Sequence, residues 1–239
     1  MDTKLETALL EVIQKISETF GPKAVLRGGM ALRLQGISRS TIDADFSFQS
    51  SVHKKKDFGE ELVNLITTLS DELIEVNYHS SIVQIIANVN SVKIIIEGST
   101  SSAFEPTIIS TAPIASRLKK QPAMISIMPN DMALAHKLAA WLERRLVRDL
   151  YDIYVLYDRL ESTPDPEVLK ARLEKINYLK GVAPRPKLRD SSEFLHFLKE
   201  QVKTLDPDVI ESQMRGMIDD RELNGIGIHI KNVLLAISF

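Results

Sequence analysis

The sequence of 239 residues predicts an α/β fold in two parts, with strands and helices mixed in residues 1–129 and helices alone in residues 130–239. Short segments rich in Ile and Val indicate strands in the first part, because they are too short between breaks to form helices. Beyond residue 130 no Gly or Pro occurs before Pro164, which favours helices. We therefore expect two domains, 1–129 and 130–239.

Composition narrows the class of protein. The chain is 44% hydrophobic and 26% charged, which is typical of a globular protein. Its formal charge of -2 is shared evenly between the two parts, so binding to a polyanion would need a local basic patch. Without cysteine, disulfides, thiolate zinc sites and thiol catalysis are excluded. Because neither a signal peptide nor an apolar run of about 20 residues is found, we expect a cytoplasmic protein that does not bind membranes.

The first part begins with an amphipathic helix and continues with strands. The helix is expected over residues 3–19 and ends before Gly21-Pro22. Gly28 and Gly29 then permit a tight turn and a close approach of the backbone to a ligand. The remaining elements are expected as strands at 23–27, 42–48, 73–78, 82–89, 92–97, 107–110 and 124–128, and helices at 30–36 and 58–69.

The second part is expected to be a helical bundle. Its helices are predicted at 131–147, 149–160, 166–177, 191–204 and 207–222, and the apolar tail 226–239 is interpreted as a last helix. Two basic stretches, Lys54–Lys56 and Lys180–Arg189, are interpreted as solvated loops, with contact to nucleic acid as the alternative.

An acidic pair stands out on the strand 42–48. Side chains alternate along a strand, so Asp43 and Asp45 share one face while Ile42, Ala44, Phe46 and Phe48 share the other. Two carboxylates this close repel each other, and a divalent metal ion is the partner that the arrangement favours. Asp206-Pro207-Asp208 has the same spacing, but it lacks a glycine turn upstream and is better interpreted as a helix cap.

Two further groups of charged residues are candidates for a site. Glu97 shares a strand face with Lys93, so it is a candidate third carboxylate or an exposed acid at a strand end. On a continuous helix, Lys137, Arg144 and Arg148 fall within about 40 degrees of one another. They would form a cationic stripe opposite Leu142, Leu146, Leu150 and Ile153. Salt bridges with Glu143, Asp149 or Asp152 are the alternative for the arginines.

The motifs together resemble a known family. Gly28-Gly29 precedes the acidic pair, and Arg39 and Thr41 lead into it, as in the core motif of the nucleotidyltransferase superfamily. The details are similar to the AbiEii/AbiGii toxin group, and KLAAWLERRLVRDLYDIYVL (137–156) resembles that group's helical signature. The resemblance implies a nucleotidyltransferase-type mixed β-sheet domain followed by a helical domain that completes an active-site cleft.

The resemblance also implies the chemistry and its residues. It implies transfer of a nucleoside monophosphate from a nucleoside triphosphate (NTP), with Mg²⁺ or Mn²⁺, to an RNA acceptor, notably tRNA, by a toxin with a cognate antitoxin. Metal ligands would be Asp43, Asp45 and Glu97, the last in place of an acid expected at Ile95. Lys137 joins these three as a catalytic residue, and nucleotide binding falls to Gly28, Gly29, Met30, Arg39, Lys137, Arg144 and Arg148.

The sequence leaves three points open. Met30 stands where a phosphate-binding Ser or Thr is common, so phosphate binding would rest on backbone N–H groups. Asp149 and Asp152 are candidates to orient the cations, cap a second helix or approach the metal. The alternatives for function are an inactive nucleotide-binding or partner-binding protein of the same fold, and an enzyme that nucleotidylates a small molecule or a protein.

Overall fold

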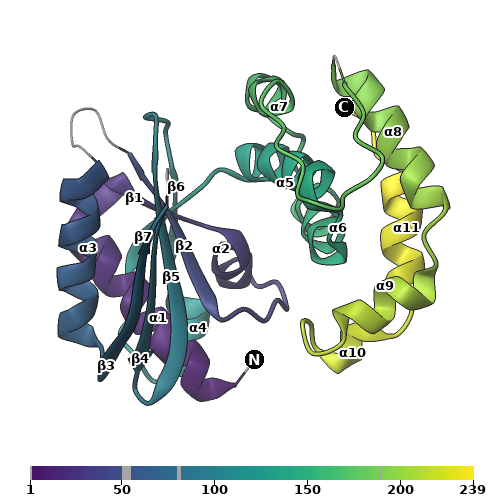
Figure 1. Cartoon of the computed structure of the whole chain (residues 1–239). Coiled ribbons are helices and arrows are strands. Elements are labelled where there is room, and N and C mark those ends of the chain that lie inside the picture. The colour runs from purple at the N-terminus through teal and green to yellow at the C-terminus, as the bar shows by residue number, and fades with distance from the viewer. Residues whose placement is uncertain (1, 50–54, 80–81, 189) are drawn as a thin grey trace. The chain divides into compact units, whose positions relative to one another are not determined.

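The computed structural model describes residues 2–49, 55–79, 82–188 and 190–239. The chain divides into two compact units, Met1–Met128 and Pro129–Phe239, which we call the α/β unit and the helical unit (Figure 1). The division falls one residue before the expected boundary. No helix in the described ranges is long and apolar enough to cross a membrane.

The described part of the α/β unit contains a seven-stranded mixed sheet with strand order β3-β4-β5-β2-β1-β7-β6. Two neighbouring pairs are parallel, β1 with β7 and β2 with β5, and the other pairs are antiparallel. The strands are β1 (Ala24–Arg27), β2 (Asp43–Gln49), β3 (Glu72–Tyr78), β4 (Ile82–Val89), β5 (Val92–Ser101), β6 (Thr107–Ser110) and β7 (Met124–Ile127). The helices are α1 (Thr3–Phe20), α2 (Gly28–Leu34), α3 (Lys55–Leu69) and α4 (Ala112–Arg117).

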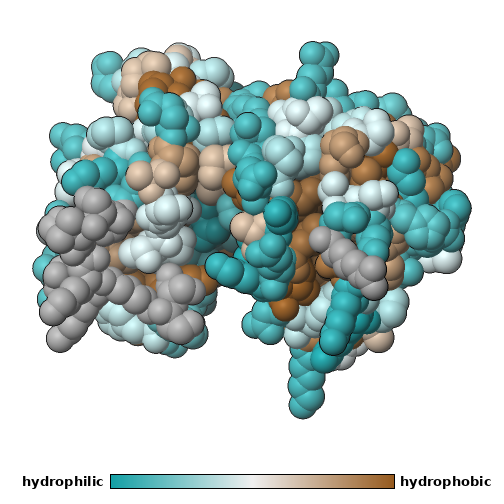
Figure 2. Space-filling view, turned by 90° about the horizontal axis from the view of Figure 1, so that it is seen from above, coloured by the Kyte–Doolittle hydropathy of each residue, from teal (hydrophilic) through white to brown (hydrophobic). Residues whose placement is uncertain are grey.

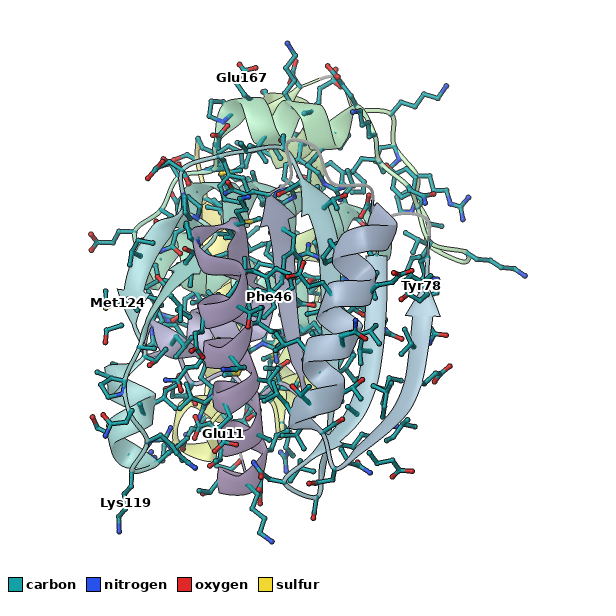
Figure 3. All side chains as sticks on the ribbon, turned by 90° about the vertical axis from the view of Figure 1, so that its left-hand side faces the viewer. Glu11, Phe46, Tyr78, Lys119, Met124 and Glu167 are labelled. Carbon is teal, nitrogen blue, oxygen red and sulfur yellow. The ribbon has the colours of Figure 1, made fainter. Side chains whose placement is uncertain are left out.

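Helices α1 and α3 cover one face of this sheet (Figure 3). Asp2 is the N-cap of α1, since its side chain accepts hydrogen bonds from the N–H groups of Lys4 and Leu5. Its apolar stripe packs on Phe46 in one continuous core. The same core includes buried residues of β4 and β5, so the helices bury one set of alternating side chains and leave the other set for the opposite face.

The structure of the α/β unit differs from the predictions at four points. Ile42 precedes β2 and is 52% exposed, so it does not join Ala44 and Phe46 in the core. The short helix begins at Gly28, two residues earlier than expected, so the two glycines belong to its first turn. No helix was predicted at α4, which begins at Ala112 and has Pro113 in its first turn. Of the basic stretch Lys54–Lys56, Lys54 lies outside the described residues and α3 begins at Lys55, within the expected loop.

The helical unit begins with two helices joined by a sharp break. They are α5 (Asn130–Arg144) and α6 (Val147–Tyr154), and a π-helical turn Val155–Arg159 extends the second. The later helices are α7 (Pro166–Leu173), α8 (Ser191–Lys203), α9 (Pro207–Met214), α10 (Asp220–Leu223) and α11 (Ile226–Ala236). The prediction of a helix over 207–222 was wrong, because α9 ends at Met214 and α10 begins only at Asp220.

The break between α5 and α6 corrects the predicted helix over 131–147. Arg145 adopts a left-handed conformation with φ 54° and ends α5. Its guanidinium donates hydrogen bonds to the carbonyl oxygens of Leu142 and Pro184 and lies over the ring of Trp141. Leu146 caps α6 and is 37% exposed, so its predicted place in the apolar stripe was wrong. The basic loop follows α7, and its last residue, Arg189, lies outside the described residues.

Figure 2 shows one face of the molecule, on which hydrophobic areas are interrupted by hydrophilic residues. Large hydrophobic side chains that remain exposed come from separate elements of both units, among them Ile74, Ile108, Met124, Leu179 and Ile228. Singly exposed apolar residues are normal on a protein surface, and none of these by itself marks a binding site.

Candidate active site

The acidic pair lies on β2 with its carboxylates on the face opposite α1 and α3. Asp43 and Asp45 are half-buried, whereas the alternate residues Ala44 and Phe46 are fully buried. Figure 3 shows Phe46 on the side of the sheet that the two helices cover. The period of two along a strand therefore directs both carboxylates away from the core, as the sequence pattern predicted.

The two glycines lie directly against the acidic strand. Gly28 has φ +72°, and a Cβ atom built on it would lie 2.2 Å from Oδ2 of Asp45. A Cβ atom on Gly29 would lie 3.0 Å from Cβ of Thr41. Only glycine combines the left-handed backbone of position 28 with so short an approach. The fold thus requires glycine at position 28, because the carboxylate of Asp45 packs onto the backbone there, and Gly29 leaves room for Thr41.

The loop before β2 orients the first aspartate. The Thr41 hydroxyl donates a short hydrogen bond to Oδ1 of Asp43. Arg39 is only 6% exposed, and its Nη1 donates to the carbonyl oxygen of Ser40 at 2.5 Å. Arg39 therefore supports the loop that carries Thr41, and its role in nucleotide binding stays a prediction. Met30 is fully buried in the core, so only its backbone could contact a phosphate.

A row of polar side chains crosses five strands at the level of Asp45. Residues paired across neighbouring strands share a face, and the pairs Asn77–Gln84, Gln84–Glu97, Glu97–Asp45 and Asp45–Arg27 follow one another. We call Asn77, Gln84, Glu97, Asp45 and Arg27 the polar row. Glu97 is thus the direct neighbour of Asp45 on the adjacent parallel strand β5, while Asp43 is paired with Ile95.

Three members of the polar row were missed by the sequence analysis. Arg27 precedes the glycines at the end of an apolar strand, Gln84 interrupts the apolar run of β4, and Asn77 lies near the end of β3. A signal for Gln84 was present, because Asn90 and Ser91 form a two-residue turn with φ 53° and 61° between β4 and β5. Such a turn fixes the hairpin register, which brings Gln84 opposite Glu97.

The charged residues of the helical unit form a compact cluster of their own. Nζ of Lys137 lies 2.6 Å from Oδ2 of Asp152 and 3.7 Å from Oδ1 of Asp149. Arg144 donates two hydrogen bonds of 2.6 Å to the carboxylate of Asp149. Both aspartates are fully buried. The hydrogen bond to Asp149 raises the pKa of Arg144 above its ordinary value although burial opposes this.

This cluster corrects the predicted cationic stripe. The break at Arg145 places Arg148 on α6, so it does not continue the stripe of α5. The charges of Lys137 and Arg144 are neutralised by the buried carboxylates of Asp152 and Asp149. This agrees with the interpretation in which the two aspartates orient the cations. Arg148 is exposed and makes no hydrogen bond or ion pair with another residue that the structure describes.

The donor set of the acidic pair suits a hard divalent cation. Mg²⁺ prefers oxygen ligands and is usually held by one or two carboxylates, with water and substrate phosphates completing its shell. Asp43 and Asp45 supply such a pair. Within the described ranges no group of three or more His, Asp or Glu residues is gathered closely enough to hold a metal ion. A bound metal would therefore rest on the two aspartates and on the substrate, and Glu97, the cross-strand neighbour of Asp45, stays a predicted third ligand.

The fold has relatives among solved structures. JHP933 from Helicobacter pylori is 16% identical with a TM-score of 0.51, covering 97% of this chain and 90% of that one. A candidate nucleotidyltransferase from H. pylori is also 16% identical with a TM-score of 0.52, covering 97% and 93%. MenT4, a nucleotidyltransferase toxin from Mycobacterium tuberculosis, is 15% identical with a TM-score of 0.46, covering 96% and 92%. The first two likenesses define a nucleotidyltransferase-like fold, a mixed α/β sheet followed by helices, as predicted.

The family follows from the sequence itself. Residues 14–223 match the family described as nucleotidyl transferase AbiEii toxin, type IV TA system, where TA stands for toxin–antitoxin. The chain therefore belongs to the AbiEii family of nucleotidyltransferase toxins, and the predicted resemblance and enzyme class are confirmed. No curated protein sequence matches the chain.

Proposed function

We propose that the protein is a metal-dependent toxin that transfers a nucleoside monophosphate from an NTP to RNA, with the acceptor end of tRNA as its substrate. The observation that supports this most directly is the half-buried pair Asp43 and Asp45 on β2, with Oδ2 of Asp45 against Gly28. Membership of the family supports an NTP as substrate and an antitoxin as partner, since the family is described as nucleotidyl transferase toxins of type IV toxin–antitoxin systems. The RNA acceptor rests on resemblance to the group.

The reaction breaks the bond between the α-phosphorus and the α,β-bridging oxygen, which releases pyrophosphate. It joins the α-phosphate to the oxygen of an acceptor hydroxyl, whose proton is released. Negative charge separates in the transition state, so positioning and charge neutralisation supply most of the catalysis. Bound Mg²⁺ or Mn²⁺ would stabilise the attacking and leaving oxygens. We assign the metal to Asp43 and Asp45, with Glu97 as the third carboxylate, because Glu97 is the cross-strand neighbour of Asp45.

The nucleotide would be bound by the glycine turn and by cations. Backbone N–H groups at Gly28, Gly29 and Met30 are the phosphate donors in this proposal, because the Met30 side chain is buried. We also propose that Lys137 binds the triphosphate. Its side chain is 20% exposed and its Nζ is already paired with Asp152, so the triphosphate would share this lysine with a buried carboxylate. Arg144 is held by Asp149 in the same way, and we assign contact with the acceptor to Arg148 because its side chain is exposed.

The test combines labelled nucleotides with defined acceptors. Purified protein is incubated with each α-³²P-labelled NTP and Mg²⁺ or Mn²⁺, in separate reactions with total tRNA, a protein extract and a set of small hydroxyl compounds. We expect label on tRNA with the wild type and none with Asp43→Ala. Asp206→Ala is the matched control, since that acid belongs to the other DxD sequence and caps α9. Label on protein or on small molecules alone would overturn the RNA acceptor.

A second candidate is a protein that binds nucleotide without turnover. The observation in its favour is the fully buried Met30, which leaves no hydroxyl side chain directly after the glycines. Calorimetry with an NTP and Mg²⁺, together with an assay for released pyrophosphate, distinguishes the two. Binding without pyrophosphate from any acceptor mixture would favour this candidate over the enzyme.

A further inference from the structure

Glu97 on β5 accepts a hydrogen bond from the neighbouring strand β4. Nε2 of Gln84 donates a hydrogen bond of 2.7 Å to Oε1 of Glu97, and both side chains are half-buried. Nδ2 of Asn77 lies 3.5 Å from Oε1 of Gln84 on the far side, a long and weak contact. The amide of Gln84 thus lies between the edge strand and the acid, in the middle of the polar row.

The position of this contact is fixed by the backbone. Gln84 and Glu97 are cross-strand partners in the β4–β5 hairpin, and Glu97 is in turn paired with Asp45. A glutamate side chain has three rotatable bonds. Without a hydrogen-bond partner it would sample several rotamers on the sheet face, and fixing one of them would cost conformational entropy. A charge-assisted hydrogen bond from a neighbouring strand selects among them. Gln84 therefore restrains the carboxylate that neighbours Asp45.

We propose that Gln84 is a positioning residue, which holds one oxygen of Glu97 so that its carboxylate acts together with Asp43 and Asp45. The proposal rests on the proposed function, because it assigns Gln84 a part in the same metal-dependent reaction. Partners that orient metal-binding carboxylates affect the metal more than the fold, and their loss reduces metal affinity or activity by about 10–100-fold. The reaction does not require Gln84 to contact the substrate.

The chain provides a matched control on the same strand. Asn88 lies on β4 with the same side-chain direction as Gln84, and its Nδ2 donates to Oε2 of Glu72 at 3.1 Å. This is also a cross-strand amide–carboxylate pair, but it is exposed and remote in register from Asp45. Gln84→Met and Asn88→Met each replace an amide by an apolar side chain, so each removes the hydrogen-bond donor from one carboxylate.

The first measurement is Mn²⁺ binding by electron paramagnetic resonance in the presence of a non-hydrolysable NTP, because it does not depend on turnover. We expect Gln84→Met to weaken Mn²⁺ binding by about 10-fold or more. Asn88→Met should leave it unchanged, and both variants should keep the wild-type melting temperature within a few degrees. In transfer assays Gln84→Met should lower kcat with little change in KM for the NTP, and a higher metal concentration should restore part of the rate. Gln84→Asn should retain part of the effect of glutamine.

A double-mutant cycle decides whether Gln84 acts through Glu97. If it does, Gln84→Met combined with Glu97→Gln should be no worse than Glu97→Gln alone, a coupling expected of residues in contact. Additive losses, an unchanged Gln84→Met protein, or an equal loss in Asn88→Met would overturn the proposal. If the wild type binds Mn²⁺ but transfers no nucleotide, only the proposed reaction fails, and Mn²⁺ affinity still tests Gln84. If the wild type binds no Mn²⁺ with nucleotide present, both proposals fail.

Discussion

Replacing Glu6 with glutamine tests the ion cluster that joins three helices of the α/β unit. Glu6 on α1 is fully buried, and its Oε1 accepts hydrogen bonds from Nε of Arg33 on α2 at 2.6 Å and from Nη2 of Arg117 on α4 at 2.7 Å. The side chain of Arg33 is 14% exposed, whereas that of Arg117 is 52% exposed. Glu6→Gln keeps the shape of the side chain and removes its charge.

The expected loss can be worked out from the two contacts. A hydrogen bond to a charged group that is largely buried contributes about 1.5–3 kcal/mol, which applies to Arg33. The contact with Arg117 is screened by solvent and contributes about 0.2–1 kcal/mol. Glu6→Gln should therefore lower the free energy of unfolding by about 2–4 kcal/mol, which for a chain of this size corresponds to roughly 5–15 °C in melting temperature.

The stability that Glu6 contributes depends on pH, because its pKa differs between the folded and the unfolded protein. Burial alone would raise the pKa of Glu6, but the hydrogen bonds from Arg117 and Arg33 outweigh burial and hold the pKa below its ordinary value of 4.5. A lowered pKa in the folded state adds stability that is complete above the unfolded pKa and is lost as the pH falls through the folded pKa. The difference between wild type and Glu6→Gln should thus be constant from pH 7 to about 5 and shrink in more acidic solution.

Urea unfolding followed by far-UV circular dichroism measures this difference. Glu18→Gln is the control on the same helix, because its exposed pair with Lys15 should contribute less than about 0.5 kcal/mol. The fluorescence of Trp141, the single tryptophan, reports separately on the helical unit. A Glu6→Gln difference below about 0.5 kcal/mol at pH 7, or one that grows on acidification, would refute the reasoning.

Three further outcomes follow from the site and the helical unit. Gly28→Ala should abolish nucleotidyl transfer, because its Cβ atom would displace Asp45, whereas Gly36→Ala, also at positive φ but with nothing within 4 Å, should remain active and lose only about 1–2 kcal/mol of stability. Asp149→Asn should lower the free energy of unfolding of the helical unit, followed by Trp141 fluorescence, by about 3–5 kcal/mol, since it breaks a buried ion pair. An unchanged free energy of unfolding would contradict this. Arg148→Ala should leave stability within about 0.5 kcal/mol, and if Arg148 contacts tRNA phosphate, the salt dependence of tRNA binding, measured by filter binding, should fall by about one unit of slope.

Much of the α/β unit was predictable because its signals are local. The alternation along β2 directed the two aspartates to one face and Phe46 to the core, and a period of two needs no knowledge of neighbouring strands. The glycine at position 28 likewise predicted a tight turn by itself, and it adopts positive φ in the structure. By contrast, the parallel pairing of β1 with β7 joins segments about a hundred residues apart. No local pattern encodes such a pairing.

The helical unit shows why the charged residues were harder to interpret. The predicted stripe assumed one continuous helix, but Arg145 ends α5 with contacts to Trp141 and to the distant Pro184 carbonyl. A helix end that is fixed by a side chain folding onto a remote loop has no signature in the periodicity. The interpretation of Asp149 and Asp152 as partners of the cations was one of several at first, and burial of both carboxylates selected it.

The sequence by itself determined the family, the α/β and helical halves, and the acidic pair beside the glycines, because alternation and turn chemistry act over a few residues. The tertiary structure alone decided which side chains surround that pair. Register across the sheet made Gln84 and Arg27 members of the polar row. Packing of α5 on α6 brought buried carboxylates to Lys137 and Arg144, which neutralise their charges. These contacts depend on long-range pairing and burial, which bring together residues that are remote along the chain.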